Sequence, residues 1–427
     1  MRRLLPDPYT DAGNVRVISK PSYESRVTMT ETVSPAHANV KGLAYAGTVM
    51  GWIDIAAGIA AKRHASTPSV TRSVDDVAFL HPVKVGDILT IQAAVNKSWK
   101  TSMEVGVKVE AESPLTGQRY FVAHAYLTFV ALSPRPSPRT YFGRKLIEHH
   151  PIRVPEVIPY SVMDKRRFEN AEERRRVRFS RKQPNHKPIQ DLMREWALGH
   201  QREAIADAPI RPHPALNVLQ HEEGDDERDQ ENVREIIRQK GRRFSKDPRM
   251  SLQPQEKRMS STFAEVVELV MPQHANTLRI TFGGQIMAWM EACAIASANR
   301  LVRAYLLTAS VDSLNFISSS HVGDVITIRS CVSRSYNSSM EVYVTVEAEN
   351  LQTGETKFTN DGFFTIAAID EEFVPVKVPS AIPESEPEVK LCQGSHERRT
   401  TRLAQRTELM RMVNASAIVA SPLQSPT

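Results

Sequence analysis

The chain contains two copies of one domain-sized segment. An ungapped match at a constant offset of 237 residues joins residues 35–128 to residues 272–365. Identical strings recur in one register, and they are Pro-x-His-Ala-Asn, Gly-x-x-Met-x-Trp, Val-Gly-Asp, Ser-Met-Glu-Val, Glu-Ala-Glu and Thr-Gly. So many identities in a single register exclude chance, so the sequence predicts a duplicated domain.

Each copy predicts one helix followed by four strands. Residues 48–64 and 285–301 are apolar on nearly every side, which is typical of a helix buried on most faces. In the first copy, β-type runs follow at 70–80, 88–97, 102–113 and 119–131, and the second copy repeats them. Gly86-Asp87 and Thr116-Gly117 fit hairpin turns between these runs. The pattern predicts an α+β fold in which an antiparallel sheet wraps one long helix.

The segments outside the two copies differ in character. Of the 427 residues 41% are hydrophobic, so part of the chain is expected to be solvated rather than packed. The predicted division is a flexible N-terminal extension (1–22), a first domain (23–133), a charged and largely disordered linker (134–258), a second domain (259–372) and a Pro/Ser/Glu-rich tail (373–427). Solvated helices fit 163–178 and 226–240, and the tail is expected to be disordered except for a short helix at 397–420.

Composition excludes several classes of protein. The net charge is +6, but no basic stripe gathers it, which argues against nucleic-acid binding. The three cysteines lack metal-type spacing, so we expect reduced thiols and neither a metal nor a cofactor. No apolar run is long enough to span a bilayer, and no signal peptide is evident. We therefore predict a cytoplasmic protein without integral membrane association, with mitochondria as the alternative because the chain starts Met-Arg-Arg-Leu-Leu.

A carboxylate occupies the same place in both apolar helices. Asp54 lies in Met-Gly-Trp-Ile-Asp-Ile-Ala-Ala, and Glu291 is its equivalent in the second copy. An unpaired buried carboxylate is costly, and burial raises its pKa toward the range of a general acid or base. In the alternative without a functional role, Asp54 lies on a solvated edge of the helix. Its recurrence as Glu291 favours a functional role for both.

Small and polar residues precede each of these helices. Gly283-Gly284 would let the backbone approach a ligand, with free amides at the helix N-terminus to polarise a carbonyl. The first copy has Ala46-Gly47 instead, so we expect a poorer amide site there. Asn39 and Asn276 lie in the preceding loops, where an amide side chain could hold a water or a carbonyl, or serve only as a turn residue, and we favour the functional role for both. We interpret the neighbouring His37 and His274 as structural.

Matching polar loops form a second set of candidates. They combine cations, hydroxyls and an aromatic ring, which suits phosphates and a purine, although an ordinary polar hairpin explains them as well. The candidates for this ligand contact are Thr71, Arg72, Ser73, Ser98, Trp99, Lys100, Thr308, Ala309, Ser310, Ser335, Tyr336 and Asn337.

Taken together, these motifs resemble the tandem hot-dog acyl-CoA thioesterases, closest to the cytoplasmic, brown-fat-type and acetyl-CoA-hydrolase-type members. The resemblance rests on His-Ala-Asn, the glycine before a Met-x-Trp helix with its carboxylate, Val-Gly-Asp and Ser-Met-Glu-Val, and it covers about half the chain. It implies a double hot-dog fold, hydrolysis of acyl-CoA to a free acid and CoA, and assembly into a homo-oligomer, a trimer of double hot-dogs. The polar loops above would then bind CoA. The tail is too short for the START domain of many close members.

The resemblance also implies sites composed across the two domains. One site would combine Asn276, Gly283 and Gly284 with Asp54, and the other Asn39 and Gly47 with Glu291. The first is expected to be stronger, because it has both glycines and the shorter carboxylate. The carboxylate would act as a general base or as a nucleophile.

Two other functions are compatible with this fold. A non-catalytic acyl-CoA binder or scaffold would keep the fold but not need the carboxylates, and both are present. A hot-dog hydratase would need a histidine on the apolar helix face, and none is seen there.

Overall fold

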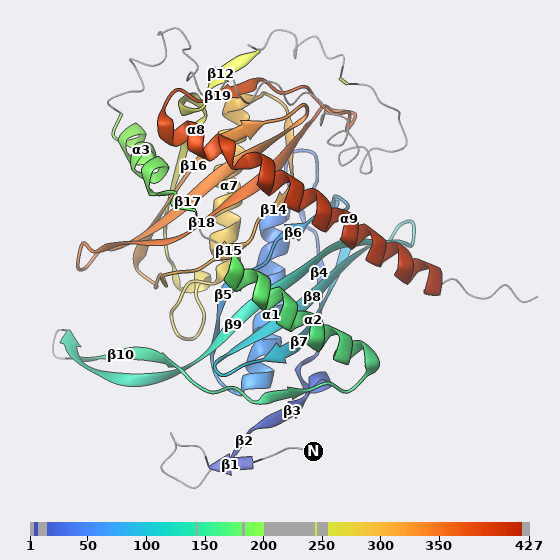
Figure 1. The fold of residues 1–427 in the computed structure, drawn as a ribbon, viewed down its shortest axis with the longest axis vertical. Coiled ribbons are helices and arrows are strands. Elements are labelled where there is room, and N and C mark those ends of the chain that lie inside the picture. Colours follow the sequence, from blue (N-terminus) through green and yellow to red (C-terminus); the bar gives the residue numbers. More distant parts are fainter. Residues whose placement is uncertain are drawn as a thin grey trace, which may run out of the picture.

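Two antiparallel sheets enclose a pair of central helices (Figure 1). The computed structural model describes residues 4–6, 15–141, 144–181, 184–199, 244–245 and 255–420. Helices α1 (Ala46–Ala65) and α7 (Gly283–Leu301) pack against each other, and each is wrapped by the sheet of its own copy. The predicted α+β double hot-dog is confirmed.

The two sheets have the same strand order. The first runs β5-β9-β8-β7-β4, with bounds Ser69–Val74, Gln118–Tyr141, Ser102–Ser113, Ile88–Ser98 and Val27–Thr32. The second runs β14-β18-β17-β16-β13, with bounds Tyr305–Val311, Thr356–Ile369, Ser339–Asn350, Asp324–Ser335 and Ala264–Leu269. The four predicted strands of each copy are present, but β4 and β13, which precede the helices, were missed.

Two short strands cross between the sheets. Strand β6 (Val77–Ala78) leaves the first copy and pairs with β14, while β15 (Leu314–Asn315) leaves the second copy and pairs with β5. The first sheet therefore continues into the second domain, and the second sheet into the first.

The central helices pack closely because small residues face the contact. A Cβ atom at Gly284 would lie 2.7 Å from the Cα of Gly51, and one at Gly47 would lie 2.7 Å from the Cα of Ala288. Real side chains do not tolerate such distances, so only glycine fits at these two positions.

The structure corrects the predicted linker. Residues 144–181 and 184–197 are ordered, and they contain β10 (Arg144–Pro151), β11 (Glu156–Ile158), α2 (Val162–Ser180) and α3 (Lys187–Ala197). Helix α2 confirms the helix expected at 163–178. In place of a broad apolar face, two of its arginines bind the buried carboxylate of Glu104 in the first sheet. The helix expected at 226–240 lies outside the described residues.

Helix α3 docks on the second sheet through apolar side chains. Ile189, Met193 and Trp196 are buried against a cluster that includes Phe263 and Tyr343. The chain between the two copies therefore also packs against the second domain.

The tail is corrected in the same way. It forms α8 (Glu386–Gln393) and α9 (Ser395–Ala420), the second of which extends the short helix expected at 397–420. Residues 421–427 lie outside the described part. Figure 1 shows α9, in red, running from the second sheet across to the first domain.

The duplication is longer than the ungapped match. Ser161 and Ser385 each form a capping box at a helix start, 224 residues apart. The short parallel pairs also recur, β11 with β3 (Ser19–Pro21) and β19 (Ser380–Ile382) with β12 (Glu256–Arg258). The offset changes because the first copy has extra residues in the β9–β10 hairpin. Beyond the repeat, β1 (Leu4–Pro6) pairs with β2 (Val15–Val17).

Among the described helices, none combines the length and apolar character needed to cross a bilayer.

Candidate active site

Asp54 is buried at the contact between the two domains. Its side chain is 3% exposed, so the solvated-edge alternative is wrong. One carboxylate oxygen accepts a hydrogen bond from the backbone N–H of Gly284 at 3.0 Å, and the other accepts from Thr71 Oγ1 at 2.6 Å. The carboxylate of one domain therefore meets the helix N-terminus of the other.

Glu291 repeats the arrangement from the second domain. It is 2% exposed and accepts from the backbone N–H of Gly47 at 2.6 Å and of Ala46 at 3.1 Å. Thr308 Oγ1 donates to it at 2.5 Å. Glu291 thus has three donors, where Asp54 has two.

Burial dominates the ionisation of both groups. It raises the pKa of Asp54, and the hydrogen bonds from Thr71 and Gly284 oppose that rise in part. Burial likewise raises the pKa of Glu291 against the donors Thr308, Gly47 and Ala46. The physical cause is the loss of water around the charged form, as the sequence predicted for Asp54.

The helix N-termini supply amides in both copies. The amides of Gly284 and Gly47 each bind the opposing carboxylate. Ala46 donates its amide as well, so the missing first glycine removes no donor from the first copy, contrary to expectation. A Cβ atom at Gly283 would lie 3.2 Å from the Cβ of Thr71, a tight contact with the threonine that holds Asp54.

The two asparagines occupy equivalent turns. Asn39 Oδ1 accepts from the amides of Lys41 and Leu43, and Asn276 Oδ1 accepts from those of Leu278 and Ile280. Each side-chain oxygen is committed to its own turn. Only the NH2 group remains to contact a ligand, so either asparagine can donate to a carbonyl or a water.

The histidines have structural partners, as expected. His37 Nδ1 accepts from the amide of Ser34, and its ring packs edge-on against Trp52 at 5.0 Å between centroids. His274 repeats this with Met271 and Trp289. Both rings hold the asparagine loop against the central helix.

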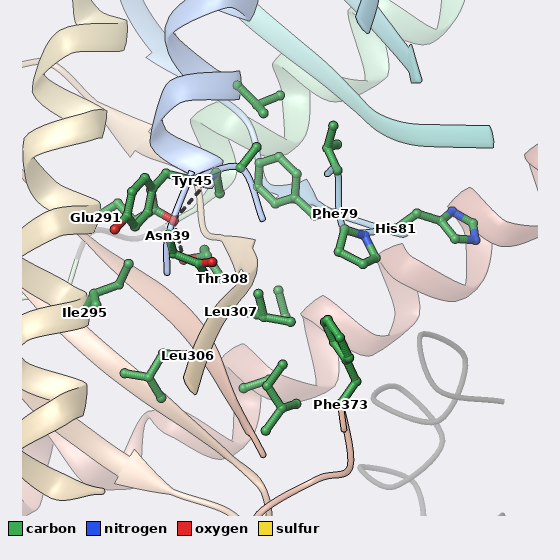
Figure 2. Close-up of a pocket in the computed structure, with 18 residues that line it drawn as sticks. Asn39, Tyr45, Phe79, His81, Glu291, Ile295, Leu306, Leu307, Thr308 and Phe373 are labelled. Carbon is green, nitrogen blue, oxygen red and sulfur yellow. Dashed lines mark hydrogen bonds between the residues drawn. The ribbon is translucent and has the colours of Figure 1, made fainter. Parts of the chain in front are cut away.

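A cavity of about 50 Å³ lies beside Glu291 (Figure 2). Asn39, Tyr45 and Thr308 approach it from the side of the carboxylate. Aliphatic and aromatic side chains form most of the remaining wall, among them Val49, Phe79, Val83, Ile295, Leu306, Leu307, Ile369 and Phe373. The volume suits a short apolar group placed next to a carboxylate.

The two threonines contact the carboxylates in the free protein. Thr71 and Thr308 were expected to contact phosphate, but each donates to a buried carboxylate instead. Both lie next to a β-bulge in their strand, a feature that reorients side chains near active sites. Their equal spacing from Asp54 and Glu291, 17 residues in each copy, was the available signal.

The remaining residues of the predicted CoA contacts have partners within the chain. Arg72 donates to the carbonyl of Phe316, Ser73 and Ser310 lie in paired strands, and the carbonyl of Ala309 accepts from Phe79. Ser98 donates to Pro155, and the carbonyls of Lys100 and Asn337 accept from Val154 and Val378. Ser335 accepts from Ala381.

The aromatic rings of the two loops are covered by the flanking helices. The guanidinium of Arg175 on α2 lies 4.4 Å from the ring centre of Trp99, and that of Arg399 on α9 lies 4.4 Å from Tyr336. One face of each ring is therefore occupied, and stacking a purine on either stays a prediction that these contacts do not favour.

Within the described ranges, no group of His, Cys, Asp or Glu is arranged to hold a metal ion, and all three cysteines are buried and free.

Comparison with known proteins identifies the family to which the chain belongs. The thioesterase superfamily model matches residues 41–118 and 278–355, one match in each copy. Acyl-coenzyme A thioesterase 11 of Mus musculus is 32% identical over 362 residues, 84% of this chain and 50% of that protein. Acetyl-coenzyme A thioesterase of Mus musculus is 30% identical over 383 residues, 89% and 58% respectively.

A bacterial relative covers a single copy. The uncharacterized acyl-CoA thioester hydrolase YkhA of Bacillus subtilis is 34% identical over 146 residues, which is 34% of this chain and 85% of that protein. The chain spans about half the length of the two mouse relatives. It belongs to the thioesterase superfamily, with the domain of that superfamily present twice.

Proposed function

We propose that the chain hydrolyses acyl-CoA thioesters to a free acid and CoA at two composite sites. The observation that carries the proposal is the pair of buried carboxylates, each facing the helix N-terminus of the other domain. The relatives named for acyl-CoA or acetyl-CoA hydrolysis support the same reaction. Both domains contribute to each site, so neither copy contains a complete site alone.

The chemistry follows from the groups present. As a general base, the carboxylate removes a proton from water while the water oxygen attacks the thioester carbonyl. The C–S bond then breaks, and the thiolate leaves with a proton to give CoA and the free acid. As a nucleophile, the carboxylate attacks the thioester carbonyl, the C–S bond breaks and the thiolate leaves as CoA with a proton; water then hydrolyses the mixed anhydride to the free acid and the carboxylate. The adjacent backbone amides and the asparagine NH2 group are donors suited to the developing oxyanion.

The amides are engaged with the carboxylates in the free protein. The Gly284 amide donates to Asp54 and the Gly47 amide to Glu291. A thioester oxygen placed between amide and carboxylate would take over the amide and release one carboxylate oxygen for the base role. Substrate binding would therefore raise the basicity of the carboxylate, because it loses a donor.

Two features favour Asp54 as the stronger base. It has two hydrogen-bond donors where Glu291 has three, and its amide contact is longer, at 3.0 Å against 2.6 Å. Fewer donors leave more of the lone-pair density for a proton. We propose a major site built on Asp54 and a minor site built on Glu291.

The resemblance to the family also suggests a location and an assembly. We propose that the chain acts in the cytoplasm as a trimer of double hot-dogs. Light scattering on the full chain should then give three times the mass of one chain, and a monomer would contradict the assembly while leaving the reaction unaffected.

The test of the reaction is release of free thiol from acyl-CoAs of two to sixteen carbons by the full chain. Thioester cleavage that yields CoA and the matching acid in equal amounts supports the proposal. Binding of CoA by calorimetry without cleavage of any chain length would instead identify an acyl-CoA-binding or scaffold protein.

A further inference from the structure

Each sheet carries a buried glutamate on the face away from its central helix. Glu104 on β8 is fully buried, and Arg174 Nη2 donates to it at 2.6 Å. Arg178, one helical turn further along α2, donates to the same carboxylate at 3.1 Å. The two arginines thereby fix α2 on the first sheet.

The second domain repeats this with α9. Glu341 on β17 is fully buried and accepts from Arg398 Nη2 at 2.6 Å and from Arg402 Nη2 at 2.7 Å. Ser333 Oγ donates to it as well, at 2.6 Å. The spacing of four residues between the arginines is the same in both helices.

The second arginine of each pair also binds the strand next to the active site. Arg178 Nη1 donates to Asp75 at 2.7 Å, and Arg402 Nη1 donates to Asp312 at 3.1 Å. These aspartates directly follow β5 and β14, the strands that carry Thr71 and Thr308. Four residues separate each threonine from its aspartate.

A chain of contacts thus connects each outer helix to one catalytic carboxylate. It runs from the guanidinium to the aspartate, along a bulged strand to the threonine, and from its hydroxyl to the carboxylate. On the α9 side the helix reaches further, because Arg406 Nη1 donates to the carbonyl of Phe79, which lines the cavity at Glu291.

Separate contacts at Asp76 link the end of α2 to α9. Its carboxylate accepts from Arg181, after α2, at 2.7 Å and from Gln405 on α9 at 2.6 Å. The amide of Ser313 donates to its other oxygen at 2.7 Å. Asp76 and Ser313 lie where β6 and β15 cross between the sheets, so the helices also hold this crossing.

We propose that Arg178 and Arg402 are positioning residues, each fixing the strand that presents one threonine, so that α2 serves the Asp54 site and α9 serves the Glu291 site. This inference rests on the proposed thioesterase function. Loss of the arginine would free the end of the strand and let the threonine hydroxyl move away from its carboxylate. A shift of this kind lowers the rate of the chemical step more than it weakens substrate binding.

The experiment uses full-length chains with one site removed. Glu291→Gln leaves the Asp54 site and Asp54→Asn leaves the Glu291 site. In the Asp54→Asn chain, Arg402→Gln should lower kcat about tenfold with KM changed less than about twofold, and Arg178→Gln should have little effect. In the Glu291→Gln chain, Arg178→Gln should lower kcat and Arg402→Gln should have little effect. Arg402→Lys should recover part of the kcat that Arg402→Gln loses.

Matched controls separate positioning from general destabilisation. Arg176→Gln on α2 and Arg411→Gln on α9 remove exposed ion pairs and should leave both sites unchanged. Where Arg402→Gln fails to fold, Asp312→Asn and Asp75→Asn remove one acceptor with nearly the same shape. If each arginine variant lowered kcat equally at both sites, in proportion to its fall in Tm, the assignment of one helix to each site would be overturned.

Hydrogen exchange gives a readout that needs no activity. Arg402→Gln should speed amide exchange in residues 305–311 and not in 69–74, and Arg178→Gln should do the opposite. A parent chain that cleaves no acyl-CoA would refute the proposed function, and the exchange pattern would still decide the inference. Uniform exchange changes in both strands would reject it.

Discussion

The two composite sites reach the same arrangement with different residues. Asp54 is one methylene shorter than Glu291 and accepts from one amide, that of Gly284. Glu291 is longer and reaches two amides, those of Ala46 and Gly47. The longer side chain thus gains one more donor, and each donor opposes part of the rise in pKa that burial causes in both carboxylates. Both copies therefore keep the geometry of the site and differ in the number of hydrogen bonds to its carboxylate.

The sharpest way to break this comparison is to remove one carboxylate at a time. Asp54→Asn should lower kcat/KM of the full chain about tenfold or more, whereas Glu291→Gln should lower it less than about threefold, because the major site then survives. The comparison is made with the acyl-CoA that the parent cleaves fastest. Equal losses, or a larger loss for Glu291→Gln, would reverse the assignment of major and minor site.

The threonines sharpen the comparison within each site. Thr71→Val and Thr308→Val each remove the hydroxyl that holds a buried carboxylate in place. Each should lower kcat of its own site roughly fivefold, because a hydrogen bond of this kind is worth about 1 kcal/mol. Measured in single-site chains, each substitution should affect only its own site. Thr67→Val, on a hydroxyl that binds backbone carbonyls away from both carboxylates, is the control.

The cavity beside Glu291 gives a test by substrate length. Leu306→Ala enlarges the apolar wall, so in a chain with Asp54→Asn it should shift kcat/KM toward longer acyl groups by roughly two- to fivefold. Exposed Leu351, replaced by alanine, serves as the matched control because it lies outside the cavity. An unchanged chain-length profile would show that the acyl group lies elsewhere.

The smallest expected effect is on stability against pH. The folded pKa of Asp54 is raised by burial, so its contribution to stability is present at low pH and is lost as pH rises through that pKa. Asp54→Asn should therefore raise Tm at pH 8 and change it little at pH 4. A Tm gain that is the same at both pH values would contradict this reading.

The activity of the Glu291→Gln chain should fall on the acid side with an apparent pKa above that of an ordinary carboxyl.

The repeat made most of the core predictable. Identical strings fixed the two helices, the four following strands and the carboxylates Asp54 and Glu291, since apolar periodicity and recurrence are local signals. The crossing strands β6 and β15 are two residues each and were not separable from β5 and β14 by pattern. Their pairing depends on contacts between domains, which a sequence does not display.

The main error was the prediction that the charged segments are solvated, and the cause is physical. Helix α2 has a strongly polar sequence, which predicts solvation, yet Arg174 and Arg178 neutralise Glu104 beneath it. Glu104 lies in a strand in which polar and apolar residues alternate, and this pattern predicts that its side chain faces solvent. Only the repeated spacing of the arginines in α2 and α9, with the repeated Met-Glu-Val string, pointed to a pairing of this kind.

The roles of single polar side chains were only partly predictable. Thr71 was placed at a ligand because hydroxyls beside cations suit phosphate, whereas its partner is a carboxylate 17 residues earlier in the chain. For Asn39 the sequence favours a functional role over a turn residue. Its oxygen accepts hydrogen bonds within the turn, and its NH2 group stays available for a ligand.

The central claim is that both carboxylates, and no other group, supply the catalytic base. Its most direct test is thiol release by the double variant Asp54→Asn/Glu291→Gln, with circular dichroism and binding of CoA as controls. We predict a loss of about 100-fold or more in kcat/KM with fold and CoA affinity retained. A double variant that folds, binds CoA and keeps the activity of the parent chain would contradict the account.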